Sequence, residues 1–460
     1  MPTSTARPLA VLTSLFFLWG FITVLNDVLV PHWKQLFELS YAQSLLVQFC
    51  FFGAYFIGSL AYYLISVSSG DPIARIGYKQ GLILGLVISA LGCALFAPAT
   101  VLHSYAAHLA ALFVLGLGFT VLQIAANPFV AIIGPPESAS SRLNLAQAFN
   151  SLGTTLAPLI GGWFIFNQVD PTTAVRLPYL GLAAVLVVIA FVVRLTRLPE
   201  PPRVDSPSTG KALRHPQLRW GMLAIFCYVG AEVAIGSLII SFLGLEHILG
   251  LGEDDAKHYL SLYWGGAMTG RFLGAIALAK GWPMAKRVLA MVAVGAAMFI
   301  LLVALNAGSA LGLEQAWPMA LLILLNMAAF VLAGPNASRA LGLFATVAMV
   351  LLGIVVAGEG LIAVWAIIAI GLFNSILWSN IFTLAIDGLG EDTAQGSSLL
   401  VMMIVGGALV PPLQGAIIDL VGVQDGAMTG FHGSFVLPMI CYAYLAWYGF
   451  KGSLQRTITA

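Results

Sequence analysis

The sequence predicts an all-α polytopic membrane protein, and three observations support this fold class. Of its 460 residues, 60% are hydrophobic and 8% are charged, whereas soluble domains carry about 25% charged residues. The apolar residues gather in runs of roughly 18–25, the length that a helix needs to cross about 30 Å of hydrocarbon. No run alternates apolar and polar residues over roughly 10 positions, as the strands of a membrane barrel do. Each run is therefore predicted to be a spanning helix.

One long polar segment, 196–218, separates these runs into two groups. It is rich in Pro, Ser and Arg and is interpreted as a cytoplasmic linker. The chain is thereby divided into an N-terminal six-helix bundle, 1–195, and a C-terminal bundle, 219–460. The first run is expected to be a retained helix, because no small-residue cleavage site follows it. The fourteen predicted spans are 8–30, 42–66, 80–99, 105–133, 143–167, 176–195, 219–244, 256–279, 286–306, 317–335, 341–358, 361–386, 397–420 and 433–450.

The basic residues predict the orientation of these spans. With both termini and the linker in the cytoplasm, only Lys34, Arg176 and Lys257 fall outside, while Arg271 falls within a span. The expected location is the bacterial inner (plasma) membrane, where lipid is the surrounding partner. A net charge of +1 gives no indication of a nucleic-acid partner. The four cysteines lie inside apolar runs and are predicted to be buried side chains, not disulfides or metal ligands.

The two halves of the chain resemble each other weakly. Four polar, glycine or proline positions of the first half recur in the same order in the second half, at nearly one offset. This pattern favours duplicated halves, with a substrate site between them near the midplane of the membrane. The matched pairs are Asn127 and Asn380, Glu137 and Glu391, Gly153 and Gly407, and Pro158 and Pro412.

Two carboxylates lie deep in predicted spans. Asp27 has no basic residue within one helical turn, and Glu232 lies in the middle of the seventh span. A charge at such a depth costs roughly 2.5–3.5 kcal/mol on insertion scales, so both are functional candidates. Both are predicted to couple transport to a cation, with Na+ binding at Asp27 as one option. The alternative for Asp27 is a protonated acid that ties two helices together by a hydrogen bond.

Carboxamide side chains stack on single helical faces in the fourth and fifth spans. Gln123 and Asn127 are four residues apart, and Gln147 and Asn150 are three apart. Because carboxamides both donate and accept hydrogen bonds, they suit a neutral polyhydroxylated ligand such as a sugar. The alternative is polar contact between packed helices. Aromatic residues at similar depth could stack on a pyranose, although most are expected to be core. The predicted substrate-binding residues are Asn26, Gln123, Asn127, Gln147, Asn150, Trp264, Phe373, Asn374 and Trp378.

Charged residues at the predicted cytoplasmic helix ends are interpreted as gates that hold one conformation closed. The seven histidines lie in loops or at helix ends and form no catalytic or metal-binding pattern, so neither an enzyme nor a cofactor is expected. The predicted gating residues are Asp71, Arg75, Arg142, Arg271, Asp387 and Glu391.

Four runs resemble the fucose permease branch of the major facilitator superfamily, and most of all its bacterial glucose/galactose transporters. They are LFFLWGFITVLND at 15–27, LQIAANPF at 122–129, RLNLAQAFNSLG at 142–153 and FCYVGAEV at 226–233. The resemblance implies a major facilitator fold of two pseudo-symmetric six-helix bundles. It also implies import of a neutral hexose, glucose and/or galactose, by alternating access coupled to a Na+ or H+ gradient.

The resemblance also assigns roles residue by residue. The family's essential first-helix aspartate corresponds to Asp27, and its fifth-helix sugar-binding carboxamides correspond to Gln147 and Asn150. Its fourth-helix glutamate corresponds to Gln123, so the second acid of the fucose symporter's proton relay is missing here. Because the family has twelve spans, a count of fourteen implies an extra helix pair inserted at about 286–335. The Gly-Asp-x-x-x-Arg-x-Gly pattern at 70–77 is interpreted as a conformational latch.

Other functions stay open at this point. One is a non-transporting membrane sugar sensor or receptor, and another is a major facilitator carrier for a different neutral polyol or sugar, such as fucose. A drug or peptide exporter is compatible with the fold alone, but the carboxamide-rich centre argues against it. The sequence does not decide which hexose is preferred or which cation is coupled.

Overall fold

The computed structural model describes residues 6–69, 72–132, 139–166, 173–198, 212–278, 283–307, 313–389, 393–422 and 430–455, and within these ranges all regular structure is helical. The predicted all-α fold is confirmed. The first half contains α1 (Ala6–Leu36), α2 (Tyr41–Ser44), α3 (Leu46–Ser69), α4 (Pro72–Ile76), α5 (Tyr78–Ala94), α6 (Phe96–Val101), α7 (Tyr105–Ile132), α8 (Ala139–Phe166) and α9 (Arg176–Leu195).

The second half contains the remaining helices, several of them interrupted. The pairs α15 and α16, and α17 and α18, each form one span in two pieces, as do α19 and α20. Their bounds are α10 (Pro216–Leu243), α11 (Glu253–Ala277), α12 (Met284–Leu305), α13 (Leu313–Ala333), α14 (Ala337–Ala357), α15 (Gly360–Asn374), α16 (Leu377–Ile386), α17 (Thr393–Met402), α18 (Gly406–Val421), α19 (Gly430–Ser434) and α20 (Val436–Phe450).

Twelve helical segments of the described chain are long and apolar enough to cross a membrane. The predicted count of fourteen is therefore not confirmed. The two predicted spans outside the twelve, 143–167 and 256–279, fall on α8 and α11. These helices have 28 and 25 residues, so length is sufficient. They are too polar, because α8 carries the carboxamides and α11 begins with three acidic residues and contains Arg271.

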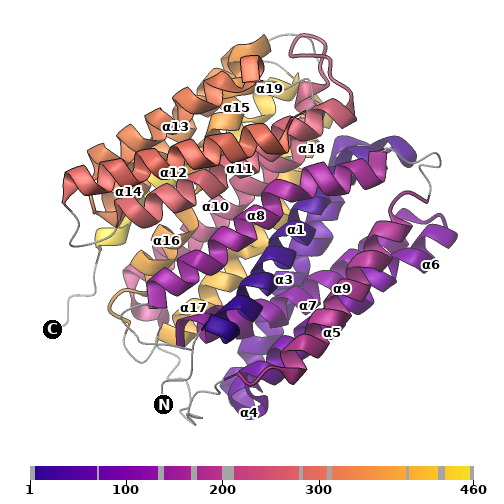
Figure 1. Cartoon of the computed structure of the whole chain (residues 1–460). Helices are drawn as coiled ribbons and strands as arrows, with labels where there is room; N and C mark the ends of the chain where they lie inside the picture. Colours follow the sequence, from indigo (N-terminus) through magenta and orange to yellow (C-terminus); the bar gives the residue numbers. More distant parts are fainter. Residues whose placement is uncertain are drawn as a thin grey trace.

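The two halves of the chain lie side by side. Figure 1 shows α5, α7 and α9 of the first half on one side of the molecule, and α12, α13 and α15 of the second half on the other. Between these groups, α8 packs along both α1 and α11, and α3 packs against α18. The polar helices α8 and α11 therefore lie at the contact between the halves. The predicted linker, 196–218, has its central part, 199–211, outside the described residues, and the predicted domain boundaries stay a prediction.

Close backbone contact joins α1 to α8, and glycines permit it. A Cβ atom added to Gly153 would lie 2.1 Å from the carbonyl oxygen of Phe17, and one added to Gly20 would lie 2.1 Å from that of Asn150. Any larger side chain at these positions would push the two helices apart. Because these glycines let the helices pack closely, the carboxamide face of α8 lies directly beside α1, the helix that carries Asp27.

Helix connections meet at two opposite ends of the molecule. One end holds α2 together with the start of α11 and the end of α18, which are joined to the first half by hydrogen bonds. We call it the α2 end. The opposite end holds α4 and the start of α10, and we call it the α4 end.

Candidate functional site

Asp27 is held at the contact between the halves. Its side chain is 3% exposed. Its Oδ1 accepts hydrogen bonds from Gln48 Nε2 of α3 at 3.0 Å and from the Ser237 hydroxyl of α10 at 3.1 Å. Its Oδ2 accepts from Trp264 Nε1 of α11 at 3.2 Å. One donor comes from the first half and two come from the second, so the carboxylate joins the halves.

Unsatisfied carboxamide atoms lie in the helices around Asp27. Both side-chain atoms of Asn26, which is 0% exposed, lack a hydrogen-bond partner among the described residues. The same holds for Oε1 of Gln48 and Oε1 of Gln123. Each buried and unpaired polar group costs about 1–3 kcal/mol. Such atoms are expected where water or a hydroxylated ligand completes the hydrogen bonds.

Gln123 belongs to a polar cluster inside the first half. It lies beside the hydroxyl of Tyr55 on α3, which also contacts Thr23 of α1. Trp19 Nε1 donates to the same hydroxyl at 3.1 Å. Thr23 is three residues before Asn26 and four before Asp27, so all three lie on one face of α1. The cluster therefore extends the polar face of α1 from Asp27 to Trp19.

The carboxamides of α8 differ in their surroundings. Asn150 is 8% exposed, and its Nδ2 donates to the carbonyl oxygen of Phe16 at 3.0 Å. This bond ties α8 to α1, as the polar-contact alternative predicts. Gln147 is half-buried one turn away, and Asn127 of α7 is also half-buried. The structure therefore places Gln147 where its side chain is less enclosed than that of Asn150.

Glu232 lies in a separate polar cluster. The Tyr228 hydroxyl donates to its Oε1 at 2.6 Å, and the Tyr263 hydroxyl contacts its backbone oxygen at 3.4 Å. Asn374 donates to Tyr263 at 2.8 Å and accepts from the Tyr442 hydroxyl. All five residues belong to the second half. Asn374, predicted to bind substrate, is thus 0% exposed and engaged in bonds among helices α11, α15 and α20.

The other predicted aromatic residues have packing partners. Phe373 is 4% exposed and packs edge-on against Phe344, with ring centroids 5.2 Å apart. Trp378 is half-buried and stacks on Phe382 at 6.1 Å. Trp264 differs, because its indole N–H reaches Asp27. Of these three aromatic residues, Trp264 alone forms a hydrogen bond to a predicted coupling residue within the described part of the chain.

Among the predicted gating residues, Arg271 spans the two halves. Its guanidinium donates to the Ser151 hydroxyl of α8 and, through Nε, to the carbonyl oxygen of Ser375 at 3.3 Å. Arg75 and Asp387 are exposed at the α4 end, where the backbone oxygen of Asp387 accepts from Gln217 at 3.1 Å. Asp71, Glu391 and the side chain of Arg142 lie outside the described residues, so their gating roles stay predictions.

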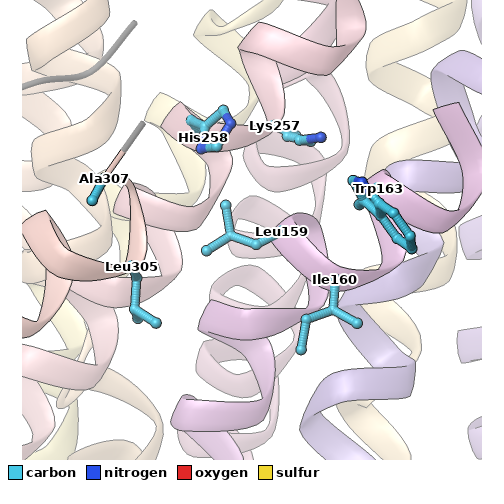
Figure 2. Close-up of a pocket in the computed structure, with 7 residues that line it drawn as sticks. All are labelled: Leu159, Ile160, Trp163, Lys257, His258, Leu305 and Ala307. Carbon is cyan, nitrogen blue, oxygen red and sulfur yellow. The ribbon is translucent and has the colours of Figure 1, made fainter. Parts of the chain in front are cut away.

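A surface cavity of about 410 Å³ lies elsewhere, between α8, α11 and the end of α12. Figure 2 shows that apolar side chains form its walls and that Lys257 and His258 lie at one side. Lys257 is paired with Asp254, and His258 Nδ1 contacts Asn306 Oδ1 at 2.9 Å. None of the predicted substrate-binding residues lines it. Its lining residues are Leu159, Ile160, Trp163, Lys257, His258, Leu305 and Ala307.

The side chains bonded to Asp27 offer it two N–H donors and one hydroxyl donor. Na+ requires oxygen ligands, and the oxygens near this carboxylate are the Ser237 hydroxyl and the unpaired amide oxygens of Asn26 and Gln48. The described residues hold no group of three or more His, Cys, Asp or Glu side chains that could bind a metal ion. Sodium binding at Asp27 would require these donors to turn away, so that option stays a prediction.

Several polar residues of this site were not predicted from the sequence. Gln48, Ser237 and Ser151 bond to Asp27 or Arg271, and Tyr55 organises the first-half cluster. Gln48 carried a usable signal, since it is a lone carboxamide in the apolar run 45–57. The serines carried none, because single hydroxyls are common in spanning helices.

The fold and the buried polar contacts between two helical halves are those of a membrane transporter, and the chain belongs to the Major Facilitator Superfamily. The family's sequence model matches residues 9–341. The chain is 43% identical to a glucose/galactose transporter of Brucella abortus, over 96% of this chain and 93% of that one. It is 30% identical to the L-fucose-proton symporter of Escherichia coli, over 95% and 91% of the two chains. The predicted resemblance to the fucose permease branch is confirmed.

A solved structure extends this likeness to three dimensions. The crystal structure of the Escherichia coli fucose:proton symporter matches with a TM-score of 0.65 and 29% identity, and the match covers 97% of this chain and 98% of that one. A match over nearly the whole of both chains gives no support to the predicted insertion of an extra helix pair. The segments predicted for that pair, 286–306 and 317–335, form α12 and α13, which are among the twelve candidate spans.

Proposed function

We propose that this protein is a secondary active transporter that imports a neutral hexose, glucose and/or galactose, by alternating access coupled to a cation gradient. The observation that carries the proposal is the position of Asp27, an ionisable group bonded across the two halves beside unsatisfied carboxamides. The names of the relatives support a sugar as the substrate class. The name of the fucose relative supports the proton as the coupling cation, with sodium as the alternative to be tested.

The coupling follows from the hydrogen bonds of Asp27. An ionised carboxylate accepts strong bonds from Ser237 and Trp264, and these bonds hold the second half against α1. A proton or sodium ion on the carboxylate neutralises the charge and weakens both bonds. The halves can then separate at this depth, and sugar hydroxyls can pair with Asn26, Gln48 and Gln123. Cation binding and sugar binding are thereby linked through one equilibrium between conformations.

The roles of the other polar residues follow from their bonds. Gln147 and Asn127, half-buried on α8 and α7, are proposed as further sugar contacts. Arg271 is proposed to restrain the halves through Ser151. Glu232 lies in a cluster of second-half residues, so we assign the coupling role to Asp27 first.

We also propose a topology. Helices α8 and α11 cross the membrane together with the twelve apolar segments, because each lies between other spans and buries its polar face at the contact of the halves. The chain then crosses fourteen times, with both termini on the cytoplasmic side of the bacterial inner membrane and the α2 end outside.

Uptake into proteoliposomes tests the proposed function. Labelled glucose and galactose are supplied under a proton gradient and, separately, under a sodium gradient. Uptake should be stimulated at least tenfold by one gradient. In Asp27→Asn, which cannot ionise, accumulation should fall to the level without a gradient while sugar exchange continues. Asp255→Asn, at an exposed position on α11, is the matched control and should behave like the parent.

Three results would change the proposal. Undiminished accumulation by Asp27→Asn would remove Asp27 from coupling. Loss of accumulation in Glu232→Gln alone would move that role to Glu232. Sugar binding without uptake by the parent protein would indicate a sensor instead of a transporter.

A further inference from the structure

Two carboxylates of the second half reach the first half at the α2 end. Asp419, near the end of α18, accepts hydrogen bonds from the backbone N–H groups of Tyr41 at 2.9 Å and Ala42 at 2.8 Å. Glu253, the first residue of α11, accepts a hydrogen bond from Gln35 Nε2 near the end of α1. Both contacts lie on the same face of the molecule and join parts of the chain more than 200 residues apart.

The contact of Asp419 completes a helix start. The first N–H groups of a helix have no partner within it. In α2, the Ser40 hydroxyl accepts from Gln43 N at 3.2 Å, which leaves Tyr41 N and Ala42 N to be bonded by another group. Asp419 supplies that group from the other half. When the halves part, water can bond the same N–H groups, so the contact can be made and broken at low cost.

Glycine makes this contact close. A Cβ atom added to Gly415, one turn before Asp419, would lie 2.9 Å from Ala42 N and 2.8 Å from Leu45 Cδ1. A neighbouring glycine of α18 behaves in the same way, since a Cβ on Gly407 would lie 3.0 Å from the ring of Phe52 on α3. One face of α18 is therefore shaped to lie directly on α2 and α3.

We propose that Asp419 and Glu253, with Gly415 as the packing surface, form the gate that closes the α2 end during the transport cycle. The gate residues hold the two halves together at the α2 end, and they do not contact substrate. The inference rests on the proposed alternating-access function, because a gate has meaning only if the halves open and close. In the structure described here the gate is shut, and Asp27 and its donors are buried beneath it.

The test measures how readily the α2 end opens. Ser261 of α11 lies under the gate, is 0% exposed and donates to the Thr155 carbonyl oxygen of α8 at 2.9 Å. Ser261→Cys therefore serves as a reporter, in a background with the four native cysteines replaced. Reaction with a membrane-impermeant maleimide is followed on intact cells and on inverted vesicles. Gly415→Ala and Asp419→Asn should each raise the reaction rate at least fivefold on the side that the α2 end faces.

Matched controls separate opening from loss of structure. Gly353→Ala adds the same methyl group in α14, where no atom lies within 4 Å, and Asp255→Asn removes an exposed charge at the same end. Both should leave the rate within twofold of the parent. Equal rates in Gly415→Ala, Asp419→Asn and the controls would overturn the gate. If Gly415→Ala does not fold, as judged by gel filtration and melting temperature, Asp419→Asn still tests the gate, because Asp419 is at an exposed position.

The readout needs no sugar, so it does not depend on which substrate the protein carries. If the parent protein moves neither hexose under any gradient but the gate variants react faster, the proposed substrate fails and the gate stands. If transport occurs and the reaction rates do not change, the gate fails and the transporter stands.

Discussion

At the scale of single residues, Trp264 has two candidate roles: it stacks on sugar, or it donates a hydrogen bond to Asp27. The sequence suggested an aromatic ring that stacks on sugar, whereas the structure gives its N–H a bond to Asp27 at 3.2 Å. Gly236 supports the second role, because a Cβ there would lie 3.2 Å from both Asp27 Oδ2 and Trp264 Cζ2. The indole and the carboxylate are therefore packed as one unit across the halves.

Trp264→Phe distinguishes these roles, because it keeps an aromatic ring and removes the donor. A hydrogen bond to a charged group contributes about 1.5–3 kcal/mol, and here it stabilises only the conformation in which the halves touch. The Ser261→Cys reporter should therefore react about tenfold faster in this variant, while hexose binding, measured by calorimetry, is not weakened. Weaker binding together with an unchanged reaction rate would instead indicate stacking on the sugar.

The site residues that could be predicted from the sequence were those whose side-chain type is rare in an apolar run. Asp27 and Glu232 were identified because a carboxylate in an apolar run is costly, and both are buried in the structure. Asn150 was selected by helical spacing and by the family resemblance, and neither can tell a ligand contact from its actual bond to Phe16. Ser237 could not be selected, since its importance comes from a partner 210 residues away.

At the level of whole helices, hydropathy predicted helix positions well and crossing assignments less well. Every predicted span coincides with one or two observed helices. The difficulty lies with α8 and α11, because helices that face a polar centre lose the uniform apolar character by which spans are recognised. The short helix α2 was not predicted, as its four residues carry no periodic signal. Its start depends on Asp419, a contact that exists only in the folded molecule.

The start of α11 predicts a pH effect on gate closure. Burial raises the pKa of Glu253 to about 7, from an ordinary value of 4.5. The charged groups around it are Asp254 and Asp255 on its own turn and Lys257, which is paired with Asp254, while α1 contributes the neutral Gln35. In the open state Glu253 is hydrated and its pKa returns toward 4.5. The closed state therefore binds the proton more tightly, so acid favours closing.

The measurement compares reporter reaction rates at pH 6 and pH 8. The Ser261→Cys reporter should react several-fold more slowly at pH 6, up to about tenfold for a full shift of this size. Rates are divided by those of Ala307→Cys, an exposed position at the same end, because thiol reactivity itself changes with pH. Glu253→Gln should remove the remaining pH dependence. A normalised rate that is equally pH-dependent in Glu253→Gln would assign the effect to another group.

At the scale of the whole molecule, the internal repeat indicated duplicated halves. The structure shows that matched positions in the two halves contact different partners. Gly153 allows α8 to approach α1 within the first half, whereas its counterpart Gly407 lies against Phe52 of the opposite half. A repeat in sequence therefore preserved a small residue while the partner changed. Periodicity could predict the close approach but not which surfaces meet, because that depends on how the halves dock.

The sides on which α12 and α13 begin and end show whether α13 crosses the membrane and whether only one of α8 and α11 does. If α8 and α11 both cross, Ala307 after α12 lies outside with α2, and Pro335 before α14 lies in the cytoplasm. Single cysteines at these exposed positions, in the background without native cysteines, should therefore react with impermeant maleimide on opposite sides: Ala307→Cys on intact cells and Pro335→Cys only on inverted vesicles. Reaction of both on one side would mean that α13 does not cross, and exchanged sides would mean that one of α8 and α11 does not. Failure of both α8 and α11 would leave the predicted pattern unchanged, but it would put the start of α11 on the opposite side from the end of α1, against the contact between Glu253 and Gln35. Only the predicted pattern is compatible with an α2 end that faces outward on both halves, which the proposed gate requires.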